Sequence, residues 1–160
     1  MKKEKYPWYK FYKNVKEHIN YPDVSMYEMI RKAASKYSSN IAYSYFGSRV
    51  TYKTFIKKID ECAKAFARMG VKSKDNVTIA MPNTPEAITC FYALNKIGAV
   101  VNMLHPLLSE EELKFGINLT NCDYLVVADL VYGKIKNISE SISVKKILYI
   151  SVAESMDPIR

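Results

Sequence analysis

Few residues of this chain have types and spacings that support chemistry, and the clearest candidate is a histidine beyond a predicted strand. His105 precedes Pro106 just after a short β-forming run. Open α/β sheets bind ligands beyond the carboxyl ends of their strands, so an imidazole there could contact a ligand. The alternative is a loop histidine that is hydrogen-bonded to the backbone. Neither His105 nor the second histidine, His18, has a Cys or His partner at the spacing of a zinc site.

Three consecutive acids, Glu110, Glu111 and Glu112, have the composition of a metal-binding patch. They follow Ser109, which with Glu112 makes an S-x-x-E capping box, so they fall in the first turn of a predicted helix. Carboxylates in that turn complement the positive end of the helix dipole. We interpret the three acids in that way and predict no metal site.

The three cysteines, Cys62, Cys90 and Cys122, lie far apart in sequence and form no C-x-x-C pair. An odd, scattered set is typical of reduced thiols in a cytoplasm rather than of a disulfide framework. We interpret them as small buried hydrophobic residues and expect a cytoplasmic protein. No apolar segment follows the basic residues 1–7, so a secretory signal is not expected.

The glycines argue against a phosphate-binding loop. Such loops need clustered glycines so that backbone N–H groups can approach an anion. Each glycine of this chain stands alone, and neither G-x-G-x-x-G nor G-x-x-x-x-G-K-[ST] can be formed. Nothing resembles G-x-S-x-G, although a catalytic triad can assemble in space without it. We therefore name no catalytic residue. The glycines are Gly47, Gly70, Gly98, Gly116 and Gly133.

Composition predicts a globular protein. The chain has 160 residues, 49% of them hydrophobic and 25% charged, which suffices for one domain with a sizeable core. No apolar run approaches the ~18 residues of a membrane span. The net charge of +8 is concentrated near the start, where the first twenty residues hold six lysines and two acids. Without an Arg-rich stripe or an aromatic RNA-binding signature, we predict no nucleic-acid partner; DNA affinity that falls steeply with salt would indicate one.

Residues 1–22 form a basic aromatic leader. Trp8, Phe11, Tyr12, Val15 and Ile19 recur at spacings of three and four, which predicts a short amphipathic helix. We expect this helix to dock on its own domain. The alternative is peripheral membrane contact through residues 1–20, because basic amphipathic helices bind anionic membrane surfaces.

Residues 23–160 begin with a predicted helix, hairpin and helix. Ser25 and Glu28 make a capping box, and residues 41–46 and 49–52 read as strands joined by Gly47-Ser48. Thr51 caps the second helix and Gly70 ends it. The apolar face of the first helix is Met26, Met29, Ile30, Ala33, Ala34 and Tyr37; that of the second is Tyr52, Phe55, Ile56, Ile59, Ala63, Phe66 and Ala67.

Beyond Asn76, strands and helices alternate. Predicted strands cover 77–81, 99–103, 124–127 and 146–150, and helices begin at Thr84, at Ser109 and at Tyr132. The helix after Thr84 shows an apolar face of Ile88, Phe91, Tyr92, Leu94 and Ile97. Gly116 inside the next helix should weaken it by about 1 kcal/mol relative to Ala. Alternation predicts parallel pairing: an α/β fold with a layered, mainly parallel sheet and flanking helices.

Several stretches in this order resemble one family. They are Thr51-Tyr52-Lys53-Thr54-Phe55, Gly70-Val71-Lys72-Ser73-Lys74-Asp75-Asn76-Val77, Met81-Pro82-Asn83-Thr84-Pro85-Glu86, Lys96-Ile97-Gly98-Ala99-Val100-Val101-Asn102, Pro106 with residues 109–113, and Asp123-Tyr124. Together they resemble the adenylate-forming (AMP-binding) enzymes, specifically the acyl-CoA synthetases. The leader and residues 102–106 look most like the fatty-acyl branch. Lys74 departs from the pattern, because the family usually has glycine there.

The resemblance implies a two-step ligase that uses ATP, magnesium and coenzyme A. A carboxylic or fatty acid attacks the α-phosphate of ATP, and coenzyme A then displaces AMP to form a thioester. In the family, the phosphate loop, the adenine- and magnesium-binding segment, the ribose-binding aspartate and the catalytic lysine all lie downstream of the matched region. We therefore expect the N-terminal portion of the AMP-binding fold, with no cofactor bound by this fragment alone and the remainder of the enzyme as its partner. The alternative is a non-catalytic binding or regulatory module.

Overall fold

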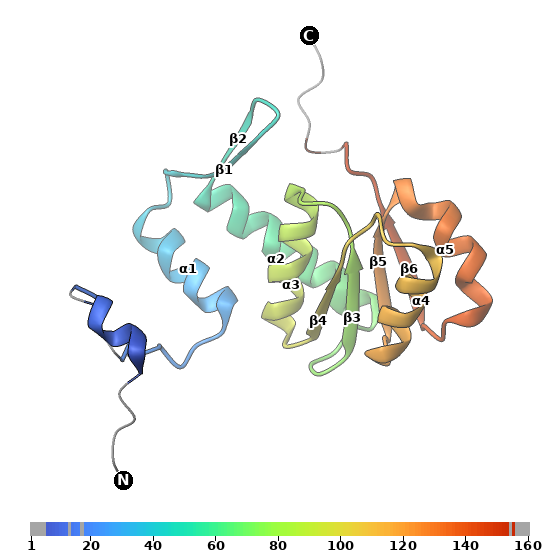
Figure 1. Cartoon of the computed structure of the whole chain (residues 1–160). Helices are drawn as coiled ribbons and strands as arrows, with labels where there is room; N and C mark the ends of the chain where they lie inside the picture. Colours follow the sequence, from blue (N-terminus) through green and yellow to red (C-terminus); the bar gives the residue numbers. More distant parts are fainter. Residues whose placement is uncertain (1–5, 13, 17, 154, 156–160) are drawn as a thin grey trace.

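A computed structural model describes residues 6–12, 14–16, 18–153 and 155. Its elements are η1 (Pro7–Phe11), α1 (Met26–Lys36), β1 (Ile41–Tyr45), β2 (Ser48–Thr51), α2 (Tyr52–Met69), β3 (Asn76–Ala80), α3 (Pro85–Ile97), β4 (Val100–Leu104), α4 (Glu110–Leu119), β5 (Tyr124–Ala128), η2 (Asp129–Val131), α5 (Tyr132–Ile138), η3 (Ser139–Ser141) and β6 (Lys146–Ile150). The predicted helix–hairpin–helix and the alternation after it are confirmed (Figure 1). Among the described residues, no helix is long and apolar enough to cross a bilayer.

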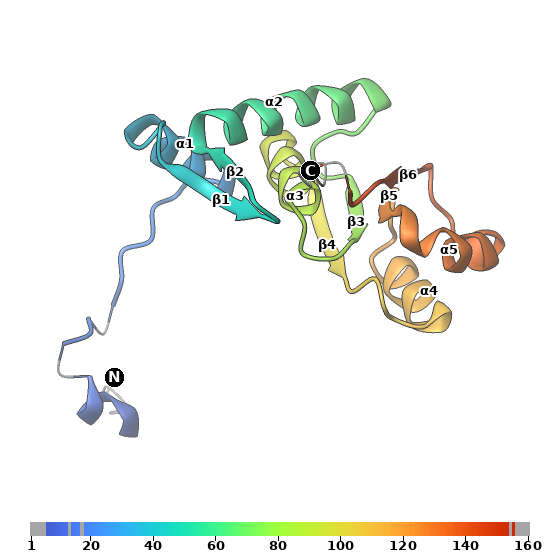
Figure 2. The same cartoon turned by 90° about the horizontal axis from the view of Figure 1, so that it is seen from above.

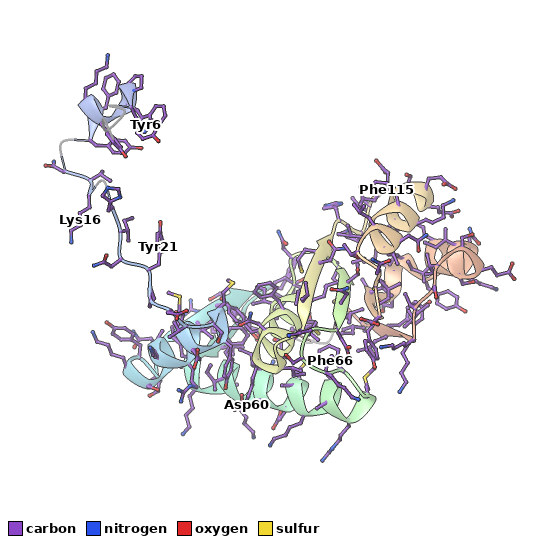
Figure 3. The ribbon with its side chains drawn as sticks, turned by 90° about the horizontal axis from the view of Figure 1, so that it is seen from below. Tyr6, Lys16, Tyr21, Asp60, Phe66 and Phe115 are labelled. Atoms are coloured by element: carbon purple, nitrogen blue, oxygen red, sulfur yellow. The ribbon has the colours of Figure 1, made fainter. Side chains whose placement is uncertain are left out.

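The leader does not form the predicted amphipathic helix docked on the domain. Of the leader residues that the structure describes, Pro7–Phe11 form a 3-10 helix and the others are not helical; none of the five is buried. The segment extends away from the α/β body (Figures 1 and 3). Its aromatic rings contact one another instead: Tyr6 stacks on Trp8 with ring centroids 4.8 Å apart. A short amphipathic helix is marginal in water unless another surface covers its apolar face, which explains why periodicity alone was not sufficient here.

Helix caps place the first elements as the sequence predicts. The Ser25 Oγ accepts from the Glu28 N–H at 3.1 Å while the Glu28 carboxylate accepts from the Ser25 N–H at 2.9 Å, so the capping box is complete. Thr51 caps α2, and Gly70 ends it with φ +102°. A left-handed residue at this position costs glycine little, which explains the sharp stop.

Two details of the N-terminal region correct the sequence predictions. The turn of the β1–β2 hairpin is Phe46-Gly47, not Gly47-Ser48, and both turn residues have positive φ, +42° and +84°. This conformation matches the right-handed twist of the flanking strands, which moves Ser48 into β2. On α1 the buried residues are Tyr27 and Ala34, whereas Met26, Met29 and Tyr37 are exposed. The helix thus turns Tyr27 toward α2, where the Tyr27 hydroxyl donates to Asp60 at 2.9 Å.

The main sheet has four parallel strands in the order β4-β3-β5-β6. Figure 2 shows α2 and α3 over one face and α4 and α5 over the other. Alternate residues of β5 separate the two cores, because Val126 packs with the α2–α3 cluster while Leu125 and Val127 pack with the α4–α5 cluster. Burial on both faces explains why β5 is apolar along its whole length.

Helix α3 buries Leu94, as predicted, but its other fully buried residues are smaller than those predicted. Its most buried residues are Ala87, Cys90, Ala93 and Leu94, whereas Ile88 is exposed. The helix packs against the sheet on one side and against α2 on the other. Small side chains on these two sides let α3 pack closely against both the sheet and α2, and the larger apolar residues lie on the partly buried sides of the helix.

Gly116 in α4 has a packing role that its helix propensity does not reveal. A Cβ at this position would lie 2.9 Å from both Cδ atoms of Leu104 on β4. The Asn102 side-chain amide reaches the Gly116 carbonyl at 3.4 Å and the Thr78 hydroxyl at 3.2 Å. Glycine therefore lets α4 approach the sheet closely, and the propensity gain expected for alanine is opposed by a steric clash.

Lys74 occupies the left-handed region in the turn before β3, with φ +71°. A side chain there costs about 1–2 kcal/mol, so we expect Lys74→Gly to raise the free energy of unfolding by about 1 kcal/mol. The Lys74 N–H donates to the Gly98 carbonyl at 2.8 Å, and glycine retains this bond. Urea unfolding measures the effect. Lys72→Gly is the control, because Lys72 lies in the same turn without a positive φ, and it should lower the free energy of unfolding. If both variants lower the free energy of unfolding, Lys74 is not strained.

Candidate functional site

The carboxyl end of the sheet is the first place to seek a site. The chain leaves β3 for α3 on one face, whereas it leaves the two strands beside β3 for α4 and α5 on the other face. Loops that diverge in this way open a crevice beyond the strand ends, where open α/β sheets bind ligands. Residues 81–84, 105–109 and the start of η2 border this region.

His105 lies at this end of the sheet, as predicted, but as an exposed loop residue. Its Nδ1 accepts a hydrogen bond from the Leu107 backbone N–H at 3.2 Å. No acid or nucleophile is hydrogen-bonded to it within the described residues. His105 thus makes the backbone hydrogen bond expected of a loop histidine, and its contact with a ligand stays a prediction. His18 belongs to the leader.

Glu110, Glu111 and Glu112 each engage a local partner. The Glu112 carboxylate completes the capping box with Ser109, at 2.8 Å from its N–H and 2.7 Å from its hydroxyl. These two hydrogen bonds hold the pKa of Glu112 below its usual value. Glu111 pairs with Lys114 at 2.6 Å, and Glu110 accepts from the Asn137 amide at 2.8 Å. Throughout the described part of the chain, no three His, Cys, Asp or Glu side chains converge as metal ligands do.

A cavity of about 380 Å³ lies between α2, the start of α3 and the end of β6. The sequence did not indicate it, because its walls come from three segments far apart in the chain. Its polar lining includes Lys58 and Glu61 of α2, Glu86 and Thr89 of α3, and Ser151 after β6; Cys62, Cys90 and Tyr149 also line it. We call the space that these residues line the α2–α3 cavity.

Glu86 is the most unusual group in the α2–α3 cavity. Both of its carboxylate oxygens are buried without a hydrogen-bond partner among the described residues, and so is the Tyr43 hydroxyl of β1. Burial, and then the Glu86 charge, raise the pKa of Tyr43 above its usual value. A buried carboxylate without partners costs free energy that the start of α3, with its positive dipole, offsets only in part.

Neutralising Glu86 should therefore stabilise the protein. We expect Glu86→Gln to raise the free energy of unfolding by about 1–2 kcal/mol, because the amide keeps the shape but removes the desolvated charge. Glu111→Gln is the matched control, since Glu111 also lies in a first helical turn but is exposed. It should change stability by less than about 0.5 kcal/mol. Urea denaturation of both variants measures this, and a clear loss for Glu86→Gln would show that its charge is compensated.

A second cavity, of about 390 Å³, lies at the opposite, amino end of the sheet. Its charged residues are Asp123 and Lys145, which pair at 2.9 Å. The Lys145 ammonium and then the Asn76 N–H hold the pKa of Asp123 below its usual value. This carboxylate thus contributes stability that is lost as the pH falls and the folded state takes up its proton. We regard this cavity as structural, because parallel sheets place their ligands at the other end.

The structure also brings together two cysteines that the sequence separates. Cys62 of α2 and Cys90 of α3 lie 3.9 Å apart, sulfur to sulfur, in the wall of the α2–α3 cavity. Cys90 and Cys122 are buried, as predicted, while Cys62 is partly exposed. No spacing rule links residues on two helices, so this proximity was not predictable from sequence.

A parallel sheet covered on both faces, in which the strand order reverses beside β3, defines an open α/β protein of the doubly wound kind. The site region lies where that class binds its ligands. The family model described as AMP-binding enzyme matches residues 30–158, so the chain belongs to the AMP-binding enzyme family. This confirms the resemblance drawn from the sequence motifs.

The relatives are larger proteins. A long-chain-fatty-acid–CoA ligase of Bacillus subtilis is 23% identical over 149 residues, covering 92% of this chain and 27% of the ligase. The corresponding ligase of Salmonella typhimurium is 24% identical over 137 residues, covering 82% and 24%. The chain thus spans about a quarter of the length of the curated relatives it matches, and it corresponds to their N-terminal portion.

Solved structures agree on the fold. A long-chain-fatty-acid-CoA ligase from Archaeoglobus fulgidus superposes with a TM-score of 0.77 at 24% identity, covering 87% of this chain and 31% of that protein. A fatty acyl CoA synthetase from Mycobacterium tuberculosis superposes with a TM-score of 0.75 at 23% identity, covering 82% and 28%. At these identities the likeness establishes the fold, and the predicted fold class is confirmed.

Proposed function

We propose that this chain is the N-terminal portion of an ATP-dependent acyl-CoA synthetase. The complete enzyme would convert a carboxylic or fatty acid, ATP and coenzyme A into acyl-CoA, AMP and pyrophosphate. Membership of the AMP-binding family carries the proposal, together with relatives that are named as CoA ligases and of whose length the match covers 27% and 24%. We place the enzyme in the cytoplasm, which agrees with its three free thiols.

Alone, the chain is proposed to be catalytically incomplete. Adenylation needs cations and backbone donors positioned around a polyphosphate. The five isolated glycines offer no such loop. Glu110–Glu112, which begin α4 after β4, are engaged in capping or pairing. The role we assign to this portion is to supply a sheet layer and helices that support nucleotide-binding segments located elsewhere in the polypeptide.

Carboxylate-dependent ATP–pyrophosphate exchange tests both parts of the proposal. Purified residues 1–160 should give no exchange above background with acids from acetate to long-chain fatty acids. The polypeptide encoded by a reading frame that continues downstream should exchange with one class of these acids. Robust exchange by residues 1–160 alone would overturn the incompleteness, and inactivity of the extended polypeptide with every acid would overturn the ligase assignment.

The competing function is a non-catalytic binding or regulatory module with the same fold. The α2–α3 cavity, with its unpartnered Glu86, is the observation that favours it. An isolated reading frame with its own promoter and terminator would support the module. A continuing frame with a Ser/Thr/Gly-rich loop would support the ligase.

We also propose that the leader contacts a membrane surface. Trp8 and Phe11 are 50% and 73% exposed, and Lys10 and Lys16 lie among the exposed aromatic residues. Aromatic rings and lysines favour an anionic interface. Deleting residues 1–20 should abolish co-sedimentation with phosphatidylglycerol vesicles, while zwitterionic vesicles should bind neither form. Co-sedimentation that is indifferent to the deletion would exclude this contact.

A further inference from the structure

Cys62 and Cys90 are 28 positions apart in sequence, yet their sulfur atoms lie 3.9 Å from each other. They come from α2 and α3, which lie against each other on one face of the sheet (Figure 2). Cys62 is partly exposed and Cys90 is buried. Both line the α2–α3 cavity, so a small solute has access to the pair.

We propose that Cys62 and Cys90 form a reversible redox-modification site in which a peroxide converts the two thiols to an intramolecular disulfide. The sulfur atoms must approach by about 2 Å to reach the length of a disulfide bond. Side-chain rotation and a small shift of α2 against α3 supply this approach. The bond would join two helices of the same core cluster through the wall of the α2–α3 cavity.

The chemistry proceeds in two balanced steps. The Cys62 thiolate attacks one oxygen of hydrogen peroxide, the O–O bond breaks, and hydroxide leaves to give a sulfenic acid on Cys62. The Cys90 sulfur then attacks the Cys62 sulfur, the S–O bond breaks, and water leaves with the Cys90 proton. Two thiols are oxidised and one peroxide is reduced to two waters. A dithiol reverses the change by thiol–disulfide exchange.

The local electrostatics favour this order of attack. The hydrogen bond with Cys90 lowers the pKa of the Cys62 thiol below its usual value. The same hydrogen bond, burial and the nearby charges of Cys62 and Glu86 raise the pKa of Cys90. The more accessible sulfur is thus the better thiolate, as the attacking residue must be, and the buried sulfur is placed to resolve it.

Cys122 provides an internal comparison. It lies in the α4–α5 cluster on the other face of the sheet, and its thiol donates to the Tyr124 carbonyl at 2.9 Å. Burial raises its pKa above the usual value. It is buried and has no cysteine neighbour on its own side of the sheet, so it should neither react with peroxide nor form a disulfide.

Peroxide treatment of the reduced, purified 160-residue chain tests the proposal. Intact-mass analysis should show the loss of two hydrogens, reversed by dithiothreitol. A non-reducing peptide map should join the peptides of Cys62 and Cys90. The unfolding midpoint of the oxidised form should rise by roughly 5–10 °C, since the bond closes a loop of about 30 residues. Cys122→Ser should behave as the parent protein, whereas Cys62→Ser should not form the bond.

A second variant keeps the test decisive if one substitution disturbs folding. In Cys90→Ala, with folding checked by circular dichroism, peroxide should leave a sulfenic acid on Cys62 that dimedone traps. Three results would overturn the proposal: unchanged thiols in the peroxide-treated parent, a bond that involves Cys122, or a bond only between two chains. Dimedone labelling of Cys90 in Cys62→Ala, with none of Cys62 in Cys90→Ala, would overturn the order of attack.

Discussion

Replacing Ile79 with alanine is expected to lower the free energy of unfolding by about 3–4 kcal/mol, which is a large part of the stability of a domain of this size. Ile79 lies on β3, the strand between β4 and β5, and its exposed fraction is 0%. It belongs to the core cluster shared with α2 and α3. The truncation removes buried methyl groups and leaves a cavity that a sheet held by neighbours on both sides cannot close.

Met103→Ala is the matched control for Ile79→Ala. Met103 faces Ile79 in the parallel register of β3 and β4, but it is 48% exposed on the edge strand. Its truncation should cost less than about 1 kcal/mol, because most of the side chain is already in water. Urea denaturation followed by circular dichroism compares the two variants. Equal losses would show that β4 is as buried as β3 in solution, contrary to the observed exposure.

The second large effect is on self-association. Strand β4 lies at one edge of the sheet, where no described residue pairs with its outer side, and Val100 on it is 55% exposed. Such an edge is a template for pairing with another chain. We therefore expect the 160-residue chain to form concentration-dependent oligomers, and we expect Val100→Lys combined with Met103→Lys to weaken association at least about tenfold, because charge on an edge opposes pairing. Sedimentation velocity over a range of concentrations measures the change.

Met29→Lys controls for the added charge. Met29 is 52% exposed, but it lies on α1 rather than on the sheet edge. It should leave the association constant within about twofold of the parent, because helix α1 offers no unpaired backbone for strand addition. Equal weakening by the α1 and β4 substitutions would point to general charge repulsion. A monomeric parent chain at all concentrations would contradict the role of the edge.

The order of elements followed from local patterns. Capping boxes at Ser25 and Ser109, glycine stops at Gly70 and Gly98, and apolar runs between them predicted the helices and strands within a residue or two. These signals act over three or four residues, so they do not depend on the rest of the chain. The prediction of an amphipathic helix in the leader was wrong because that signal is not local. Its periodicity has meaning only if another surface covers the apolar face.

Which side of a helix is buried was harder to predict. On α1 and α3 the predicted apolar faces were right only in part. Ala34 and Leu94 are buried as predicted, but packing between two neighbours also buries Tyr27 and Ala93, which the pattern did not indicate. The role of Gly116 was equally unpredictable, because glycine is needed there to leave room for the Leu104 side chain on the neighbouring strand. Helix periodicity says that one face is apolar, whereas the distance to the neighbouring element decides which residues fit there.

By itself, the sequence determined the α/β class, the parallel alternation and membership of the AMP-binding family, because caps, turn residues and family motifs are encoded locally. It also identified His105 as a loop residue at the ligand end of the sheet. Only the tertiary structure decided that the Glu86 carboxylate is buried without a hydrogen-bond partner in the described part of the chain, and that Cys62 lies beside Cys90. Those relations join segments tens of residues apart, and their distances arise from how α2 and α3 pack on the sheet rather than from spacing along the chain.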